Sequence, residues 1–248
     1  MAQARGEYIA LCSDDDRFLP DHLANSVAHL RTYPRVGLVH SSFVDSIEKS
    51  ESQELVPRVL RSASPLTVDR KHLLPYLLRY YDWPFHPSTI VMRRKVWNRV
   101  GPFDEAYQLT DTDWFVRAAE IFAVTMLPRH GVINRRHAGN WSNRMGSSQM
   151  QREIFQIVDG SIRRREWGPL QQFMWRFLWR TNVRLRLLLT LRARLNTGHT
   201  QAAVAAWQAM CQGTGRSIPR FIQRAGETAI RGYSLRRNLQ PNESVSPL

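Results

Sequence analysis

The sequence predicts an α/β fold over residues 1–150 and a mainly α-helical region over residues 151–237. Short apolar runs typical of strands alternate with amphipathic segments as far as Met150, and no strand-like run follows. The 248 residues, 43% of them hydrophobic, suffice for one sizeable core or two small ones. They exclude a disulfide-rich peptide and a fibrous repeat.

The chain is expected to begin with a strand, an acidic loop and a helix. Residues 7–12 (EYIALC) form a short apolar run, which Ser13 and three aspartates close. Over residues 22–32 apolar side chains recur at helical spacing, and Pro34 ends the helix. The end of a buried strand is a common place for a functional site.

Further strands and helices alternate up to residue 128. In order, we expect a strand over 36–43, a surface loop over 45–54, a helix over 68–81, a strand over 88–92, a helix over 93–100, a helix over 113–122 and a strand over 123–128. Gly101 and Pro102 close the helix over 93–100.

The region after Met150 reads as helix over residues 151–195, interrupted only at Gly168-Pro169. Arginines recur there at every fourth residue from 176 to 184, and aromatic and leucine side chains cover the remaining faces. Such a basic amphipathic helix suits a membrane interface, and the alternative is a helix packed on its own domain with solvated arginines. The polar residues 238–248 predict a disordered tail.

Positive charge is concentrated in the helical region. The whole chain has a net charge of +14, and residues 1–150 contain 19 basic and 16 acidic side chains. Residues 151–248 contain 16 arginines, no lysine and 5 acidic side chains, a balance of +11. This asymmetry indicates an anionic partner, either nucleic acid or an acidic membrane surface, unless it only reflects an arginine-rich composition.

The cysteine and apolar patterns predict a cytoplasmic protein. Cys12 and Cys211 lack the spacing of a zinc or disulfide framework, which fits a reducing compartment. The first residues do not read as a signal peptide. No stretch reaches the roughly 18 apolar residues of a membrane-spanning helix.

Asp14, Asp15 and Asp16 crowd three carboxylates after the first strand. A hard divalent cation would relieve their repulsion, and Mg²⁺ or Mn²⁺ prefers such oxygen ligands. The alternative is an acidic loop that is merely solvated.

Several blocks of the sequence resemble family 2 glycosyltransferases, which have the GT-A fold, a Rossmann-like fold of nucleotide-diphospho-sugar transferases. The segment GEYIALCSDDDRFLPDHL, residues 6–23, resembles the surroundings of the family's DXD motif. Four more blocks follow in the family's order: STIVMRR at 88–94, VGPFDE at 100–105, TDTDWFVR at 110–117 and RHAGNWS at 136–142. The resemblance covers residues 4–144.

The resemblance implies a role for one carboxylate in the third of these blocks. Asp111 matches the family's catalytic base, which takes the proton of the attacking hydroxyl. Asp113 is the second choice, and its alternative role is to cap a helix N-terminus. The implied reaction is a single displacement with inversion at the anomeric carbon.

The resemblance also implies a donor site. Asp14 and Asp15 would bind the nucleotide-sugar, and Asp15, Asp16 and His137 would hold Mg²⁺ or Mn²⁺ against the charge of the diphosphate. For His137 the alternative is a capping or core histidine.

The chain departs from the family pattern in three places. Ser13 stands where the first aspartate of the motif is usual, and Thr110 stands where an acidic residue often precedes the base. Family members place an apolar strand and a nucleotide-binding half before the acidic motif, which here begins at Ser13. We therefore expect an incomplete GT-A domain that lacks its N-terminal nucleotide-binding strands.

Three functions remain open at this stage. The first is a nonprocessive inverting glycosyltransferase that adds a sugar to a glycan or lipid-linked acceptor of the cell envelope, at the cytoplasmic face of a membrane. The second is a noncatalytic remnant or partner subunit that binds membrane or glycan. The third, a nucleic-acid-binding protein, is suggested only by charge and tryptophans and has no supporting motif.

Aromatic side chains near the blocks offer a further expectation. Trp83, His86 and Trp114 are candidates for stacking on a sugar ring, although tryptophan more often packs in a core.

Overall fold

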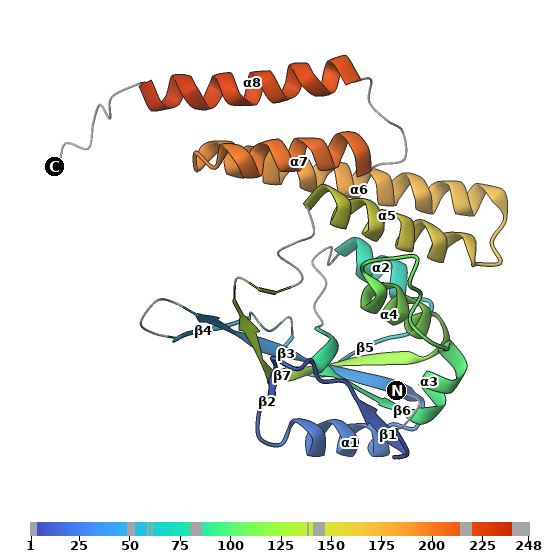
Figure 1. Cartoon of the computed structure of the whole chain (residues 1–248). Coiled ribbons are helices and arrows are strands. Elements are labelled where there is room, and N and C mark those ends of the chain that lie inside the picture. The colour runs from blue at the N-terminus through green and yellow to red at the C-terminus, as the bar shows by residue number, and fades with distance from the viewer. Residues whose placement is uncertain are drawn as a thin grey trace. The chain divides into compact units, whose positions relative to one another are not determined.

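A computed structural model describes residues 4–48, 53–58, 60, 62–79, 86–137, 139–140, 147–213 and 220–239. The chain divides into two compact units, Met1–Arg144 and Met145–Leu248. The strands belong to the first unit and the described part of the second is helical (Figure 1). The sequence predicts this change of structure at residue 150.

A mixed sheet forms the middle of the first unit. Within the described residues it has seven strands in the order β1-β6-β3-β7-β2, with β4 paired to β3 and β5 paired to β7. β3 and β7 run parallel, and the other pairs are antiparallel. The strands are β1 Tyr8–Ala10, β2 Arg17–Phe18, β3 Val36–Glu48, β4 Gln53–Pro57, β5 Leu66–Val68, β6 Ile90–Arg93 and β7 Ala123–Arg136.

Helices cover both faces of the sheet (Figure 1). Helix α1, His22–Thr32, packs Leu30 into a core cluster with Val39 of β3 and Val91 of β6. On the other face lie α2, Leu73–Arg79, and α4, Thr110–Ile121. This layered α/β arrangement is compatible with an incomplete Rossmann-like domain.

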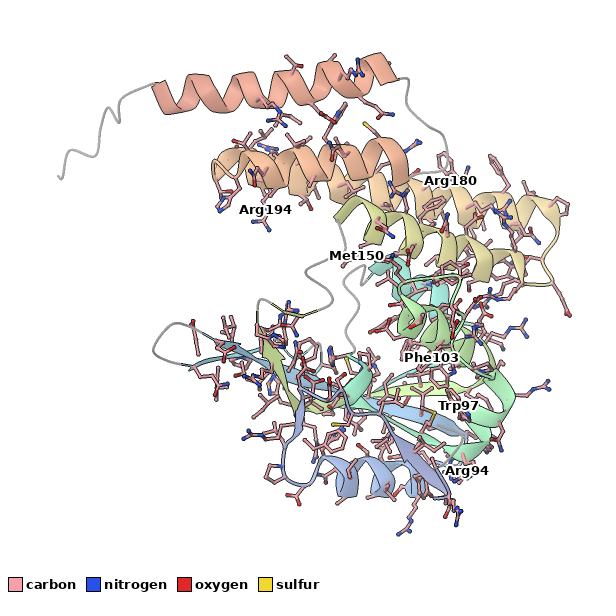
Figure 2. All side chains as sticks on the ribbon, viewed as in Figure 1. Arg94, Trp97, Phe103, Met150, Arg180 and Arg194 are labelled. Atoms are coloured by element: carbon pink, nitrogen blue, oxygen red, sulfur yellow. The ribbon has the colours of Figure 1, made fainter. Side chains whose placement is uncertain are left out.

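An aromatic cluster joins α3, Arg94–Val100, to α4 (Figure 2). Trp114 of α4 is fully buried, stacks on Trp97 with ring centroids 5.9 Å apart, and meets the edge of Phe103. The Trp114 indole N–H donates to the Gly101 carbonyl at 2.9 Å. Gly101 has a φ of 83°, a conformation that favours glycine. Trp114 is therefore a core residue rather than a sugar platform.

Four helices form the described part of the second unit: α5 Ser147–Arg163, α6 Pro169–Asn196, α7 Thr200–Gly213 and α8 Arg220–Leu239. Pro169 occupies the first turn of α6, where its fixed φ suits a helix start. Ala203 of α7 and Ile230 of α8 are buried in one cluster, against which Leu191 of α6 packs. The prediction of a mainly helical region agrees with these elements.

The described residues of the polar stretch 45–54 lie in strands, not in the surface loop that we expected. β3 continues to Glu48, and β4 begins at Gln53 and pairs antiparallel to it. Asp45 explains how a polar residue fits into this strand, because its buried carboxylate has three partners, one of them Arg136 Nε at 3.5 Å. Its carboxylate accepts a hydrogen bond from Asn134 Nδ2 at 2.6 Å and pairs with Arg58 Nε at 2.8 Å.

Two other element predictions need correction. Residues 66–68 form a strand paired with β7, and the helix expected over 68–81 begins only at Leu73. The strand expected over 123–128 runs to Arg136. Pro128 lies at a shift in register between β3 and β7, where a residue without an N–H donor is tolerated.

The predicted tail needs a smaller correction. Asn238 and Leu239 belong to α8, and residues 240–248 lie outside the described residues. Among the residues that the structure describes, no helix combines the length and the apolar character needed to cross a membrane.

Candidate active site

The acidic loop lies between β1 and β2 and is held by a segment far away in the sequence. Ser13 N–H donates to Ser88 Oγ at 2.9 Å. Ser88 is buried in the short 3₁₀ helix η1, Pro87–Thr89, which leads directly into β6. Ser13, the residue that departs from the family motif, thus takes part in fixing the loop through its backbone.

Asp16 is the most tightly held carboxylate of the loop, with a fully buried side chain. Its Oδ2 accepts a hydrogen bond from Ser88 Oγ at 2.5 Å and lies 3.2 Å from His86 Nδ1. Its Oδ1 accepts the backbone N–H of Arg135 at 3.3 Å. Burial opposes ionisation, but the contacts with His86 and Ser88 outweigh it and lower the pKa of Asp16. Both oxygens are thereby engaged by protein groups.

Asp15 faces the segment that follows β7. Its Oδ2 lies 3.3 Å from His137 Nε2 and accepts a hydrogen bond from Asn140 Nδ2 at 3.1 Å. The Asn140 side-chain oxygen accepts the backbone N–H of His137 at 2.5 Å, so Asn140 holds both partners. The Asp15 and His137 side chains remain 28% and 31% exposed, which leaves them accessible to a ligand.

Asp111 lies in the first turn of α4 and is half-buried. Its Oδ1 accepts the backbone N–H of Thr112 at 2.7 Å. Burial raises the pKa of Asp111, and the helix N–H and the nearby His86 imidazole offset this only in part. A carboxylate with a raised pKa is a stronger proton acceptor once it is ionised.

His86 connects the acidic loop with Asp111. The imidazole contacts Asp16 and interacts electrostatically with Asp111. It also packs against Phe43 of β3, with ring centroids 5.5 Å apart. From the sequence alone, His86 is a candidate only for stacking on a sugar ring. Its position two residues before the STIVMRR block was the available signal for a role in the site.

Asp113 has a different environment from Asp111. Its side chain is almost fully buried and pairs with Arg117 Nε at 2.7 Å. Arg117 also donates to the carbonyls of Val100 and Pro102 at 2.8 and 2.9 Å. Asp113 therefore fixes α4 against the turn that follows α3, which is a structural task.

The predicted site residues fall into distinct environments. Asp15 lies with His137, Asp16 lies with His86 and Ser88, and Asp14 is exposed on the same loop. Trp83 lies outside the described residues, as do Ala138, Trp141 and Ser142 of the last block. Asn140 and Ser88 received no role from sequence, although both stand inside recognised blocks.

Three or more His, Cys, Asp or Glu side chains suited to holding a metal ion do not come together anywhere in the described part of the chain. Asp15 and His137 nevertheless provide an accessible carboxylate and imidazole. Mg²⁺ commonly binds through one or two carboxylates and completes its shell with water and substrate phosphates. The pair fits the protein's share of such a site, whereas both Asp16 oxygens are already engaged.

The chain is similar in sequence to a protein named as a glycosyltransferase. No family model matches the chain. Over 136 residues the chain is 29% identical to a Bacillus subtilis (strain 168) protein named "Uncharacterized glycosyltransferase YwdF". The matched region is 53% of this chain and 46% of that protein, so the chain spans about half the length of this relative.

Proposed function

We propose that the first unit is the acceptor-side part of a family 2 glycosyltransferase with an incomplete GT-A domain. The similarity to a protein named as a glycosyltransferase supports glycosyl transfer. The observation that carries the proposal is that His86 links two kinds of acidic position, the loop that contains Asp15 and Asp16 and the helix start that contains Asp111. Transfer of a sugar needs both a site for the diphosphate and a base for the acceptor.

Asp15 and His137 are proposed to face the leaving group. A nucleoside-diphosphate sugar gains negative charge on its diphosphate as the sugar departs, and Mg²⁺ or Mn²⁺ bound there would neutralise that charge. Asp15 would be its carboxylate ligand and His137 its imidazole ligand, with Asn140 orienting both through its hydrogen bonds. Asp14, exposed beside Asp15, would contact the nucleotide-sugar.

Asp111 is proposed to accept the proton of the attacking hydroxyl. Its raised pKa suits this role, because the proton affinity of the carboxylate increases with its pKa. An acceptor held by Asp111 would attack the anomeric carbon from the side opposite the diphosphate. Such a single displacement inverts the configuration at that carbon.

Asp16 and His86 are proposed as positioning residues. Asp16 joins the acidic loop to η1 through Ser88 and to the end of β7 through the Arg135 N–H. The loop that contains Asp15 is thereby fixed relative to the segment that contains His137. We extend the proposal to the acceptor, which would be a glycan or lipid-linked hydroxyl of the cell envelope at the cytoplasmic face of a membrane.

The test compares Asp111→Asn with Glu105→Gln, a matched loss of an exposed carboxylate nearby. Nucleoside-diphosphate sugars are screened with glycan and lipid-linked acceptors, and product is measured by mass spectrometry. We expect Asp111→Asn to lower transfer by about 10²- to 10⁴-fold, with binding of the same nucleoside diphosphate and Mn²⁺ unchanged by calorimetry. Glu105→Gln should transfer normally.

A second variant separates the donor site from the base. Asp15→Asn should weaken calorimetric binding of the nucleoside diphosphate with Mn²⁺, which Asp111→Asn leaves unchanged. Full transfer by Asp111→Asn would remove the base assignment. Absence of transfer by the natural chain, with glycan binding retained, would favour the noncatalytic partner subunit.

A further inference from the structure

Helix α6 presents a stripe of large apolar side chains to solvent. Its members share one face of the helix, recurring at intervals of three and four residues within residues 170–178 and again within 185–189, with a seven-residue interval between the two groups. The stripe comprises Leu170, Phe173, Met174, Phe177, Leu178, Leu185, Leu188 and Leu189, which are between 42% and 82% exposed. At 1.5 Å per residue it extends for about 28 Å along the helix. Exposed apolar patches of this kind mark interaction sites.

The stripe is separate from the face by which α6 packs in its own unit. Trp179, Val183 and Leu187 are buried, with exposed fractions of 2%, 1% and 6%. The Arg180 guanidinium lies 5.6 Å from the centroid of the Phe155 ring of α5. This contact adds to the packing of α6 against α5. The helix thus has two apolar faces. Leu191 and Leu195, about five turns after Phe173 and Phe177, pack on the cluster of Ala203 and Ile230, whereas the stripe side chains up to Leu189 stay exposed within the described residues.

The charge around the stripe is strongly positive. The second unit contains 16 arginines and 5 acidic residues. Arg192 and Arg194 are exposed on the last turns of α6, beyond Leu188 and Leu189. A partner for this surface must accept apolar side chains and also supply negative charge.

We propose that α6 docks on an anionic membrane surface, with the stripe inserted among the lipid acyl chains and the arginines at the headgroups. An amphipathic helix that lies in the membrane plane has this combination of an apolar face and flanking arginines. Anionic lipid attracts a basic surface, whereas a second copy would bring two strongly positive units together. A nucleic acid would satisfy the arginines but offers no apolar phase for eight side chains.

The test is flotation of the full chain with lipid vesicles. We expect the chain to float with vesicles of phosphatidylcholine and phosphatidylglycerol, to float poorly with phosphatidylcholine alone, and to lose binding as salt increases. The double variant Phe173→Ser/Phe177→Ser should bind the anionic vesicles about tenfold more weakly or worse, with an unchanged circular dichroism spectrum. Arg192→Gln/Arg194→Gln should reduce binding to anionic vesicles only.

The matched control is Leu55→Ser/Ile121→Ser, which removes apolar side chains that are 57% and 51% exposed in the first unit. This control should float like the natural chain. Equal flotation of the phenylalanine variant would overturn the proposal, as would failure of the natural chain to float. The proposal would also be overturned if light scattering showed that the natural chain is a dimer and the phenylalanine variant a monomer, while both floated equally with the vesicles. Tight single-stranded oligonucleotide binding that this variant alone loses would reassign the face to nucleic acid.

Discussion

The first unit contains 16 acidic and 19 basic side chains, whereas the second contains 5 acidic side chains and 16 arginines. The carboxylates of the first unit have separate tasks: Asp16 anchors a loop, Asp113 anchors a helix, and Asp15 stays accessible. In the second unit the buried Asp159 serves two arginines at once. The two units thus use their described carboxylates differently: in the first unit one of them stays accessible beside a histidine, whereas in the second a buried one neutralises arginines of two helices.

The largest expected effect concerns Asp159. It pairs with Arg163 of α5 at 2.5 Å and with Arg176 of α6 at 3.0 Å, and its own side chain is 6% exposed. Asp159→Asn leaves two arginines without their counterion and should lower the free energy of unfolding by about 2–3 kcal/mol, allowing for the exposure of Arg163. Urea denaturation measures this.

The control for Asp159 is Glu166→Gln, the loss of an exposed acid in the same unit. It should change the free energy of unfolding by less than about 0.5 kcal/mol. Equal effects of the two variants would mean that the charge balance of the unit, rather than the two ion pairs of Asp159, determines stability.

A second prediction compares two carboxylates of α4 in the first unit: Asp113, which pairs with Arg117, and Asp111, the proposed base. Asp113→Asn should destabilise the protein by about 2 kcal/mol, because Arg117 loses its buried partner but keeps its two carbonyl acceptors. Asp111→Asn should cause no loss of stability at neutral pH, since burial already disfavours its charged form. Thermal denaturation of the two variants side by side checks this, and a greater loss in Asp111→Asn would contradict it.

The smallest expected effect is on the pH dependence of stability, to which Asp16 and Asp111 contribute with opposite signs. The pKa of Asp16 is lowered on folding, so its stabilisation is present above 3.8 and is lost as pH falls through the folded pKa. The pKa of Asp111 is raised, so ionisation costs stability as pH rises from 3.8 through the folded pKa. The free energy of unfolding is measured by denaturation from acidic to neutral pH. Compared with the natural chain, Asp16→Asn should lose less of it on acidification, and Asp111→Asn should gain more of it as the pH rises.

Helix ends were predictable where local stereochemistry determines them. The helix over 22–32 is confirmed, and α3 ends at Gly101, whose positive φ suits glycine. Pro169 begins α6 because it needs no hydrogen-bonded N–H there. These signals lie in the residues themselves.

Strand extents and the remaining site residues depend on contacts far along the chain. Asp45 is part of a strand because Asn134 satisfies it from 89 residues away. Asn140 reaches Asp15 across 125 residues, and Ser88 reaches Asp16 across 72. The resemblance identifies Asp15 and His137 as candidates. The sequence of the acidic loop alone does not reveal which distant side chains will contact its carboxylates.

The separation of Asp15 and His137 also has a consequence for synthesis. The two residues are 122 positions apart, and the strand that leads to His137 begins only at Ala123. At 5–20 residues per second a ribosome needs roughly 6–24 s to make the intervening chain. During that interval the acidic loop has been made without its imidazole partner, so the contact between Asp15 and His137 forms late, after most of the sheet has been translated.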